Sequence, residues 1–232
     1  MNEIKTFTKG SQNFLDLVKI IKYRYKFKKE NPFFFNPSGI WVFCGPQGSG
    51  KTLSAIQCLY KMLDMYPNAI VVSNLNIKGV PYVPFDDYNQ LVEMDNGTDG
   101  IIFFIDEIHV LWNSLESKNI PISEMACFCQ MRKSRRVIIG TSQVYSRIAK
   151  PIREQLQYCI ACHSVFFGLI QVNEVLDCNN TIEDSNGHIS APCLYKNWWF
   201  HSPMLYDSYD TLNKINRIER DSRDWKGGFD FD

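Results

Sequence analysis

Residues 39–52 read Gly-Ile-Trp-Val-Phe-Cys-Gly-Pro-Gln-Gly-Ser-Gly-Lys-Thr, an apolar run that passes directly into a glycine-rich one. The second half fits the pattern G-x-x-x-x-G-K-[S/T], in which small residues let successive backbone N–H groups curl around an anion at a helix start. Residues 40–43 have the composition of a buried strand. After the loop, Leu53, Ile56 and Leu59 recur at helical spacing. The stretch therefore predicts a strand, a phosphate-binding loop and a helix in succession.

The loop predicts a nucleoside triphosphate as ligand, with ATP and Mg²⁺ as the cofactors. The residues predicted to bind it are Gly45, Pro46, Gln47, Gly48, Ser49, Gly50, Lys51 and Thr52. Lys51 is expected to reach the β- and γ-phosphates, while the amides of residues 48–51 surround the phosphate oxygens. Thr52 is expected to ligate Mg²⁺ through its hydroxyl.

A second apolar run, residues 101–105, ends in two consecutive carboxylates, Asp106 and Glu107. Open α/β sheets bind their ligands at the carboxyl ends of the strands, which is where this pair would lie. Asp106 is predicted to hold the hydration shell of the Mg²⁺ ion, and Glu107 to orient and polarise the attacking water. Together with the phosphate-binding loop, the pair predicts NTP hydrolysis.

A third apolar run ends in Thr141, Ser142 and Gln143. Polar groups at a neighbouring strand end are placed to contact the γ-phosphate or the water, and Gln143 is the predicted sensor. An ordinary strand-end turn is the alternative. Nucleotide kinases need no such residue and usually lack a glutamate directly after the metal-binding aspartate, so both features favour a hydrolytic motor.

Basic residues flank this third run on both sides. They are Arg132, Lys133, Arg135 and Arg136 before it, and Arg147, Lys150 and Arg153 after it. One of them is a candidate arginine finger, a residue that stabilises the transition state from a neighbouring subunit. Arg132 and Arg153 are the preferred candidates, while phosphate-backbone contact or plain solvation is the alternative reading.

The order of elements predicts an α/β fold: a P-loop NTPase with a RecA-like, mostly parallel sheet flanked by helices. Strands are expected at residues 40–44, 69–74, 101–106, 136–142, 158–165 and 167–176, and helices at 50–65, 122–133 and 147–157. We predict an N-terminal extension at 1–38, the ATPase core at 39–176 and a C-terminal segment at 177–232. Within the last segment, 177–192 reads as a polar loop and 221–232 as a tail.

In the N-terminal extension, a short helix is expected around residues 14–21, where apolar residues recur at helical spacing. Basic and aromatic residues then alternate over residues 22–29, a pattern suited to phosphate backbones and base or sugar faces. The alternative is an edge strand or helix with its aromatic side on the core and its lysines in water.

The composition is that of a globular protein, with 45% hydrophobic and 22% charged residues and a net charge of zero. No overall basic field is available to bind nucleic acid. Without an apolar membrane-spanning run or a secretory signal, a cytoplasmic location in the host cell is expected, with peripheral association at a membrane or virion left open. Cys159 and Cys162 with His163, and Cys127 with Cys129, fit haem or zinc patterns weakly, and core packing is favoured.

Several short motifs together resemble the zonula occludens toxin-like ATPases of the FtsK-HerA group. They are Gly-Pro-Gln-Gly-Ser-Gly-Lys-Thr at 45–52, Val-Val-Ser-Asn-Leu-Asn-Ile at 71–77, Ile-Asp-Glu at 105–107, Gln-Met-Arg-Lys at 130–133, Gly-Thr-Ser-Gln at 140–143 and Ile-Arg at 152–153. The resemblance implies a DNA-pumping ATPase of a virus or mobile element, a homo-oligomeric ring, often hexameric, and capsid or assembly proteins as further partners.

One departure from that family bears on function. Members that extrude filamentous virions usually carry a transmembrane segment after the ATPase domain, and this sequence shows none. The expectation therefore moves towards a motor that packages viral DNA or moves mobile-element DNA. A nucleotide kinase, or a nucleotide-binding module without turnover, is the alternative function.

Overall fold

The computed structural model describes residues 14–180, 182–183 and 189–209. The chain divides into two compact units between Phe34 and Phe35, and each is described by itself. The predicted tail at 221–232 lies outside the described residues.

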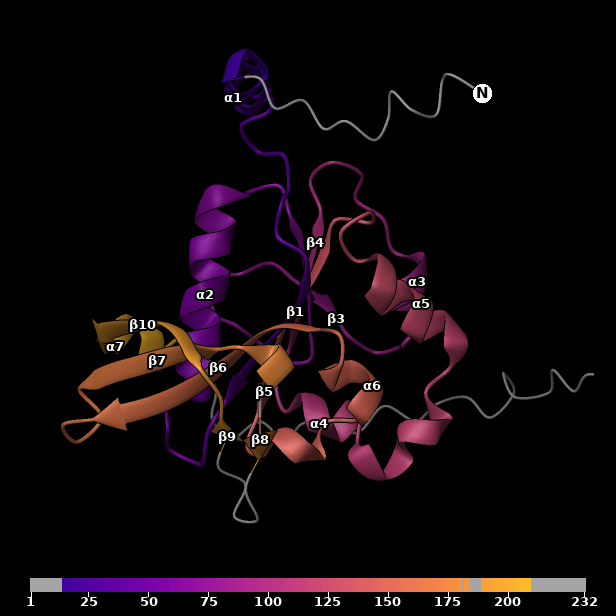
Figure 1. Ribbon diagram of the computed structural model, residues 1–232. Helices are drawn as coiled ribbons and strands as arrows, with labels where there is room; N and C mark the ends of the chain where they lie inside the picture. Colours follow the sequence, from indigo (N-terminus) through magenta and orange to yellow (C-terminus); the bar gives the residue numbers. More distant parts are fainter. Residues whose placement is uncertain (1–13, 181, 184–188, 210–232) are drawn as a thin grey trace, which may run out of the picture. The chain divides into compact units, whose positions relative to one another are not determined.

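The larger unit is built on an eight-stranded sheet with the order β10-β7-β6-β1-β5-β4-β2-β3 (Figure 1). The strands are β1 (Gly39–Cys44), β2 (Ile70–Ser73), β3 (Val83–Pro84), β4 (Ile101–Ile105), β5 (Arg136–Ser142), β6 (Leu156–Val165), β7 (Ile170–Leu176) and β10 (Cys193–Phe200). The strands from β6 to β3 pair in parallel, and β7 and β10 extend that sheet in antiparallel pairing. This is the mostly parallel α/β sheet that the sequence predicts.

The register of the three central strands brings the predicted site residues to one edge. Cys44 of β1 is opposite Ser142 of β5, and Ile105 of β4 is opposite Gly140. Because parallel strands end at the same edge of a sheet, the segments that follow β1, β4 and β5 lie side by side.

Helices cover both faces of the sheet (Figure 1). The helix α2 (Lys51–Met65) lies on one face, where Ile56, Leu59 and Phe104 belong to one buried cluster. The short helices α3 (Gln90–Glu93), α4 (Ile108–Leu111), α5 (Ile122–Gln130) and α6 (Lys150–Arg153) cover the other face. There Trp112 packs edge-on against Phe128 in the second buried cluster. Alternate side chains of the central strands belong to the two clusters in turn, so both faces of the sheet are buried.

The predicted helix at 147–157 is wrong. The chain forms a 3₁₀ turn, η3 (Tyr145–Arg147), then the single turn α6, and enters β6 at Leu156. The helix α6 begins at Lys150, and Pro151 lies in its first turn, where proline is well suited. The residues that follow form β6, because this strand buries the side chains of Leu156 and Cys159 in the core.

Two more segments differ from expectation. The helix predicted at 122–133 ends at Gln130, and Arg135 adopts a left-handed conformation with φ 50° that ends any helix. The region 177–192, predicted to be a loop, contains the 3₁₀ turn η4 (Cys178–Asn180) and the antiparallel pair β8 (Ile182–Glu183) and β9 (Ile189–Ser190).

The smaller unit contains the helix α1 (Phe14–Glu30), which is longer than predicted. It continues through the basic and aromatic residues 22–29, so their alternation does not mark a strand. Lys19, Lys22, Lys26 and Lys29 recur every three or four residues and so share one side of the helix. In the part of the chain that the structure describes, no helix has the length and apolar character needed to cross a bilayer.

The cysteines that fit haem or zinc patterns lie mostly in the core. Cys159 and Cys162 are buried on β6, and burial raises the pKa of the Cys162 thiol to about 12. Cys127 is buried on α5, whereas Cys129 is exposed. Among the described residues, no three His, Cys, Asp or Glu side chains gather in a way that could hold a metal ion.

Candidate nucleotide site

The phosphate-binding loop connects β1 to α2 at the carboxyl edge of the sheet. The Gly45 N–H donates to the Ser142 carbonyl at 3.2 Å, which fixes the start of the loop to β5. A Cβ on Gly45 would lie 2.8 Å from the Cys162 carbonyl oxygen, so only glycine fits there. Gly50 caps α2 at φ 78° and offers no side chain to the first turn. The N–H groups of that turn are therefore placed for an anion.

Two features of the loop fit a bound phosphate. The Ser49 hydroxyl is buried and makes no hydrogen bond with any described residue. The Lys51 side chain is only 9% exposed, although an ammonium group prefers water. Phosphate oxygens would satisfy the hydroxyl and the ammonium group together, so these residues fit the nucleotide that the sequence predicts.

Asp106 and Thr52 meet at the end of β4. The Asp106 Oδ1 atom accepts hydrogen bonds from the Thr52 hydroxyl at 3.2 Å and from the Thr141 hydroxyl at 2.6 Å. Burial raises the pKa of the Asp106 carboxyl, and the two hydroxyl bonds oppose that shift. The donor set of hydroxyl and carboxylate oxygens is the kind that Mg²⁺ takes, so Thr52 and Asp106 fit the predicted metal.

Glu107 turns towards the loop in an unusual backbone conformation. Its φ is 52°, in the left-handed region, and its N–H donates to the Thr141 hydroxyl at 2.9 Å. Its Oε1 atom lies 3.7 Å from the Lys51 Nζ atom and accepts a hydrogen bond from Gln143 Nε2 at 3.3 Å. The structure thus brings Lys51, Glu107 and Gln143 together, as their positions in the sequence led us to expect.

Two residues at the site were given no role there from the sequence. Asn74, just after β2, accepts from the Asp106 N–H at 2.8 Å and donates to the Asp106 carbonyl at 2.9 Å. His109 Nδ1 lies 3.3 Å from Glu107 Oε2 and 3.1 Å from the Ser142 hydroxyl. Burial lowers the pKa of His109, while the Glu107 charge opposes the shift. Asn74 carried a signal, as a polar residue ending the strand beside β4; His109 carried none.

The two preferred finger candidates lie in different settings. Arg132 is exposed and precedes β5, so it belongs to the sheet edge opposite the loop. The Arg153 guanidinium carbon lies 5.4 Å from the centre of the Tyr145 ring. Among the residues that the structure describes, neither makes a hydrogen bond or an ion pair with the phosphate-binding loop of its own chain. The Arg147 charge reaches the site, because it contributes to lowering the pKa of His109.

Arg136 has a structural setting that the sequence did not predict. The residue is 7% exposed. Its guanidinium group donates hydrogen bonds to the carbonyls of Leu91, Val92 and Met94 at the end of α3. It is therefore neither solvated nor placed at a strand tip beside the phosphate-binding loop.

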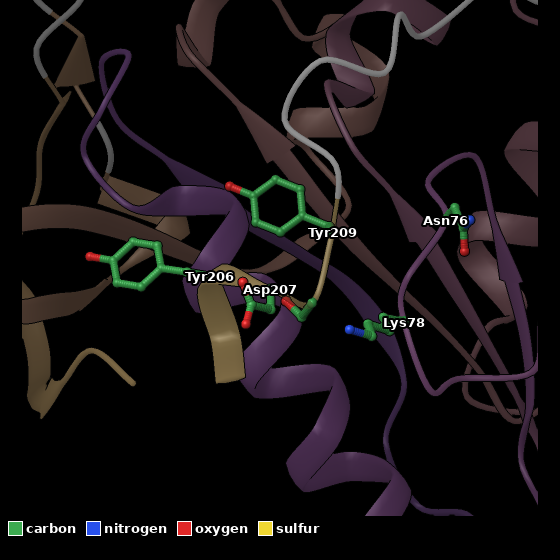
Figure 2. A pocket seen from close by; sticks show the side chains of 6 residues that line it. Asn76, Lys78, Tyr206, Asp207 and Tyr209 are labelled. Atoms are coloured by element: carbon green, nitrogen blue, oxygen red, sulfur yellow. The ribbon is translucent and has the colours of Figure 1, made fainter. Parts of the chain in front are cut away.

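A pocket of about 430 Å³ lies between the segment after β2 and the segment 206–209 (Figure 2). Its lining residues are Asn76, Lys78, Tyr206, Asp207, Ser208 and Tyr209. The Lys78 N–H donates to the Ser208 carbonyl at 2.7 Å, which joins the two segments. Burial raises the pKa of Tyr209, and the Asp106 charge adds to the shift. The C-terminal segment therefore reaches the neighbourhood of the site.

The sequence from residue 41 to residue 163 matches the family model described as "ATPase family associated with various cellular activities (AAA)". This match covers slightly more than half of the 232 residues. The chain belongs to the AAA ATPase family. The matched range of this AAA ATPase contains the phosphate-binding loop, Asp106, Glu107 and Gln143.

Solved structures are similar to this AAA ATPase at low sequence identity. The N-terminal domain of zonular occludens toxin from Neisseria meningitidis has a TM-score of 0.55 and 14% identity, over 75% of this chain and 99% of that one. The genome packaging NTPase B204 from Sulfolobus turreted icosahedral virus 2, in complex with ATP-gammaS, has a TM-score of 0.47 and 12% identity, over 73% and 99%. The first likeness confirms, at the level of the fold, the predicted resemblance to zonula occludens toxin-like ATPases. No curated protein sequence matches the chain.

Proposed function

We propose that this AAA ATPase hydrolyses ATP with Mg²⁺ and uses the energy to move the DNA of a virus or mobile element. The observation that carries the hydrolytic part is the placement of Glu107 beside Lys51 and Gln143, next to the Thr52–Asp106 pair. A loop that only binds nucleotide has no need of a second carboxylate aimed at its lysine.

The residues divide the chemistry among them. Lys51 and the first-turn amides of α2 hold the β- and γ-phosphates, and Thr52 and Asp106 hold Mg²⁺. When bound, the metal ion neutralises charge that develops on the phosphate oxygens. Glu107 accepts a proton from a water molecule as the water oxygen bonds to the γ-phosphorus and the bond to the ADP oxygen breaks. Gln143, which donates to Glu107, orients the carboxylate or the water.

The Lys51–Glu107 contact supports a change on nucleotide binding. The two side chains stand 3.7 Å apart, and both are mostly buried. A γ-phosphate carries more negative charge than a carboxylate and would compete for the Lys51 ammonium. Glu107 would then be released towards the water, so the catalytic carboxylate becomes available only when the triphosphate is present.

The DNA part of the proposal is supported by the sequence motifs that resemble DNA-pumping ATPases. That resemblance also implies a homo-oligomeric ring and, for genome packaging, capsid or assembly proteins as partners. An arginine supplied by a neighbouring subunit would then complete each site. Within the described part of the chain, neither Arg132 nor Arg153 makes a hydrogen bond or an ion pair with its own phosphate-binding loop, which is consistent with supply from a neighbour.

Steady-state ATP hydrolysis tests the proposal. The rate is measured over a series of protein concentrations, with and without single- or double-stranded DNA, and with a Lys51→Ala variant as the inactive reference. A DNA-stimulated rate per chain that rises cooperatively with concentration supports a ring motor with shared sites. Phosphate transfer to another nucleotide without DNA stimulation would support the kinase alternative, and binding without turnover would support a nucleotide-binding module.

A further inference from the structure

Two amide side chains are buried where the sheet faces the phosphate-binding loop. Gln171 is 0% exposed and Asn173 is 7% exposed, and both lie on the inward side of β7. Glutamine and asparagine are mostly surface residues, and a buried amide is costly unless its hydrogen bonds are satisfied. Their partners therefore indicate what the pair stabilises.

Both amides bind the loop and the helix that follows it. Gln171 Nε2 donates to the Ser49 carbonyl at 3.0 Å and to Asn173 Oδ1 at 3.1 Å. Asn173 Oδ1 also accepts from the Ser54 hydroxyl on α2 at 3.0 Å. Gln171 therefore uses both of its amide hydrogens and is held in one orientation.

The bond to Ser49 acts on the next amide of the loop. In a trans peptide the C=O and N–H groups point in opposite directions from the same plane. Holding the Ser49 carbonyl towards β7 therefore points the Gly50 N–H away from β7. Gly50 is one of the residues whose amide is predicted to bind phosphate. A Cβ on Gly50 would collide with the Gln171 side chain, so the glycine lets Gln171 approach the loop.

A second set of side chains contacts the amide oxygen of Gln171. His201 Nε2 lies 3.0 Å from Gln171 Oε1, and an amide oxygen only accepts, so Nε2 carries a hydrogen. His201 Nδ1 contacts the Tyr206 hydroxyl at 2.5 Å, and that hydroxyl also lies 2.9 Å from the Gly168 carbonyl. Tyr206 belongs to α7 (Pro203–Tyr206), so the chain of contacts runs from the loop to that helix.

We propose that Gln171 is a positioning residue for the phosphate-binding loop, held in place by His201 and Tyr206. The proposal deepens the function proposed above and rests on it, since the phosphate is the ligand of the positioned amides. Gln171 does not touch the nucleotide; it sets the direction of the Ser49–Gly50 peptide before the nucleotide arrives. This pre-organisation lowers the cost of ordering the loop on binding.

Amide hydrogen exchange of the nucleotide-free protein tests this inference. Gln171→Met keeps the side-chain length and removes both donors. We expect faster exchange confined to residues 47–52 and an ATP dissociation constant about tenfold higher, the effect of about 1.4 kcal/mol from losing the bond to the Ser49 carbonyl. Glu174→Gln, on the other face of the same strand, is the control and should change neither. Unchanged loop exchange, or faster exchange throughout α2 and the sheet, would overturn the proposal.

A second pair of variants tests the link without replacing Gln171. His201→Phe removes the donor to Gln171 Oε1, and we expect a smaller increase in loop exchange than in Gln171→Met. His201→Gln can donate from nearly the same place and should restore wild-type exchange. Equal exchange in the two variants would overturn the role of His201. Since exchange is measured without nucleotide, a failure of the wild-type protein to bind ATP would refute the proposed function without deciding the role of Gln171.

Discussion

Glu107 holds a backbone conformation that a residue with a side chain rarely adopts. At φ 52° it costs about 1–2 kcal/mol relative to a right-handed conformation. Such strain persists where the surroundings hold it, here through the Glu107 N–H bond to the Thr141 hydroxyl. The conformation turns the carboxylate back towards Lys51, which is the direction that the proposed chemistry requires.

Glu107→Gln is expected to bind ATP normally and to hydrolyse it at least about 10²-fold more slowly, because the amide cannot accept the proton of the water. Single-turnover hydrolysis separates this step from binding, which a fluorescent ATP analogue measures independently. Glu116→Gln, on the 3₁₀ segment Ser114–Asn119, serves as the control. A wild-type single-turnover rate in Glu107→Gln would assign the role to another residue.

Asp106 is expected to reduce the stability of the metal-free protein. Burial raises the pKa of its carboxyl in the folded state, so the folded protein is penalised when the group is ionised. The penalty is complete above the folded pKa, decreases as the pH falls below it, and is absent below the pKa of the unfolded chain. Asp106→Asn should therefore raise the melting temperature at pH 7, by about 2–4 °C if the penalty is about 1 kcal/mol, while abolishing hydrolysis.

Thermal unfolding of both proteins in EDTA and without nucleotide checks this expectation over a range of pH. The difference in melting temperature should shrink on acidification, since the wild-type carboxyl is then neutral too. Asp64→Asn, at an exposed position of α2, is the control variant. A lower melting temperature for Asp106→Asn at every pH would contradict the account.

At the residue scale, the sequence was informative where a motif fixes local geometry. The loop pattern places Lys51 and Thr52 at a helix start, and Asp106 and Glu107 follow a buried strand, so their proximity could be predicted. Their catalytic roles stay predictions. Gln171 reaches Ser49 across more than a hundred residues of chain, and no local pattern indicates that pairing.

At the scale of elements, a buried cation supports the helix α3. The Arg136 guanidinium donates to carbonyls at the carboxyl end of that helix and contacts Cys127 Sγ at 3.3 Å. A cation is favourable at this end because the helix dipole is negative there. The bond to the Leu91 carbonyl is buried, whereas the bonds to the Val92 and Met94 carbonyls are partly buried.

Arg136→Met is expected to lower the free energy of unfolding by about 2–3 kcal/mol, since one buried and two partly buried hydrogen bonds from a charged group are lost. Urea denaturation measures the change. Arg132→Met, four residues earlier and exposed, should alter stability by less than about 0.5 kcal/mol. Equal stability of the two variants would show that the carbonyls find other partners.

The helix α1 presents the most basic surface of the described elements. Lys19, Lys22, Lys26 and Lys29 share one side, and exposed salt bridges join Lys19 to Asp16 at 3.2 Å and Lys26 to Glu30 at 3.7 Å. Exposed salt bridges of this kind contribute little to stability. The lysines can therefore leave these carboxylates and bind phosphate groups instead. If the protein binds DNA, this side of α1 is a suitable contact.

Replacing Lys22 and Lys29 by Gln should weaken DNA binding and lower its salt dependence. Each lost phosphate contact reduces the slope of log K against log salt by about 0.7–0.9, because fewer counterions are released. Fluorescence anisotropy with labelled DNA over a salt series measures both quantities. Lys61→Gln, exposed on α2, controls for a general change in charge. An unchanged slope would remove α1 from the DNA contacts.

Long, patterned elements were predictable and short connecting ones were not. The apolar runs of β1, β4 and β5 and the periodic helix α2 match their predicted positions closely. The error at 147–157 arose because η3, α6 and the start of β6 together contain helix-favouring residues. The segment from residue 156 forms a strand and not a helix because Leu156 and Cys159 are buried in the sheet, a tertiary effect that outweighs local helix propensity.

At the scale of the whole molecule, the predicted site residues lie at one sheet edge and Arg132 belongs to the other. Arg132 is exposed, whereas Arg153 is half-buried against the Tyr145 ring. An arginine that acts on a neighbour must be reachable from outside its own chain. A head-to-tail contact between copies would bring one edge against the other, the geometry that closes rings. Arg132 is therefore the preferred finger candidate.

We predict that Arg132→Ala loses about 10³-fold or more in the rate of ATP hydrolysis while keeping its affinity for ATP. Lys51→Ala is inactive for a different reason, because its own loop cannot hold the triphosphate, yet its Arg132 is intact. Mixing the two inactive proteins should restore part of the activity, since an intact loop can face an intact arginine only across subunits. The measurement is hydrolysis against mixing ratio, with a maximum at intermediate ratios. Activity that stays absent at every ratio, or an Arg132→Ala protein as active as wild type, would exclude Arg132 as a residue supplied to the neighbouring site.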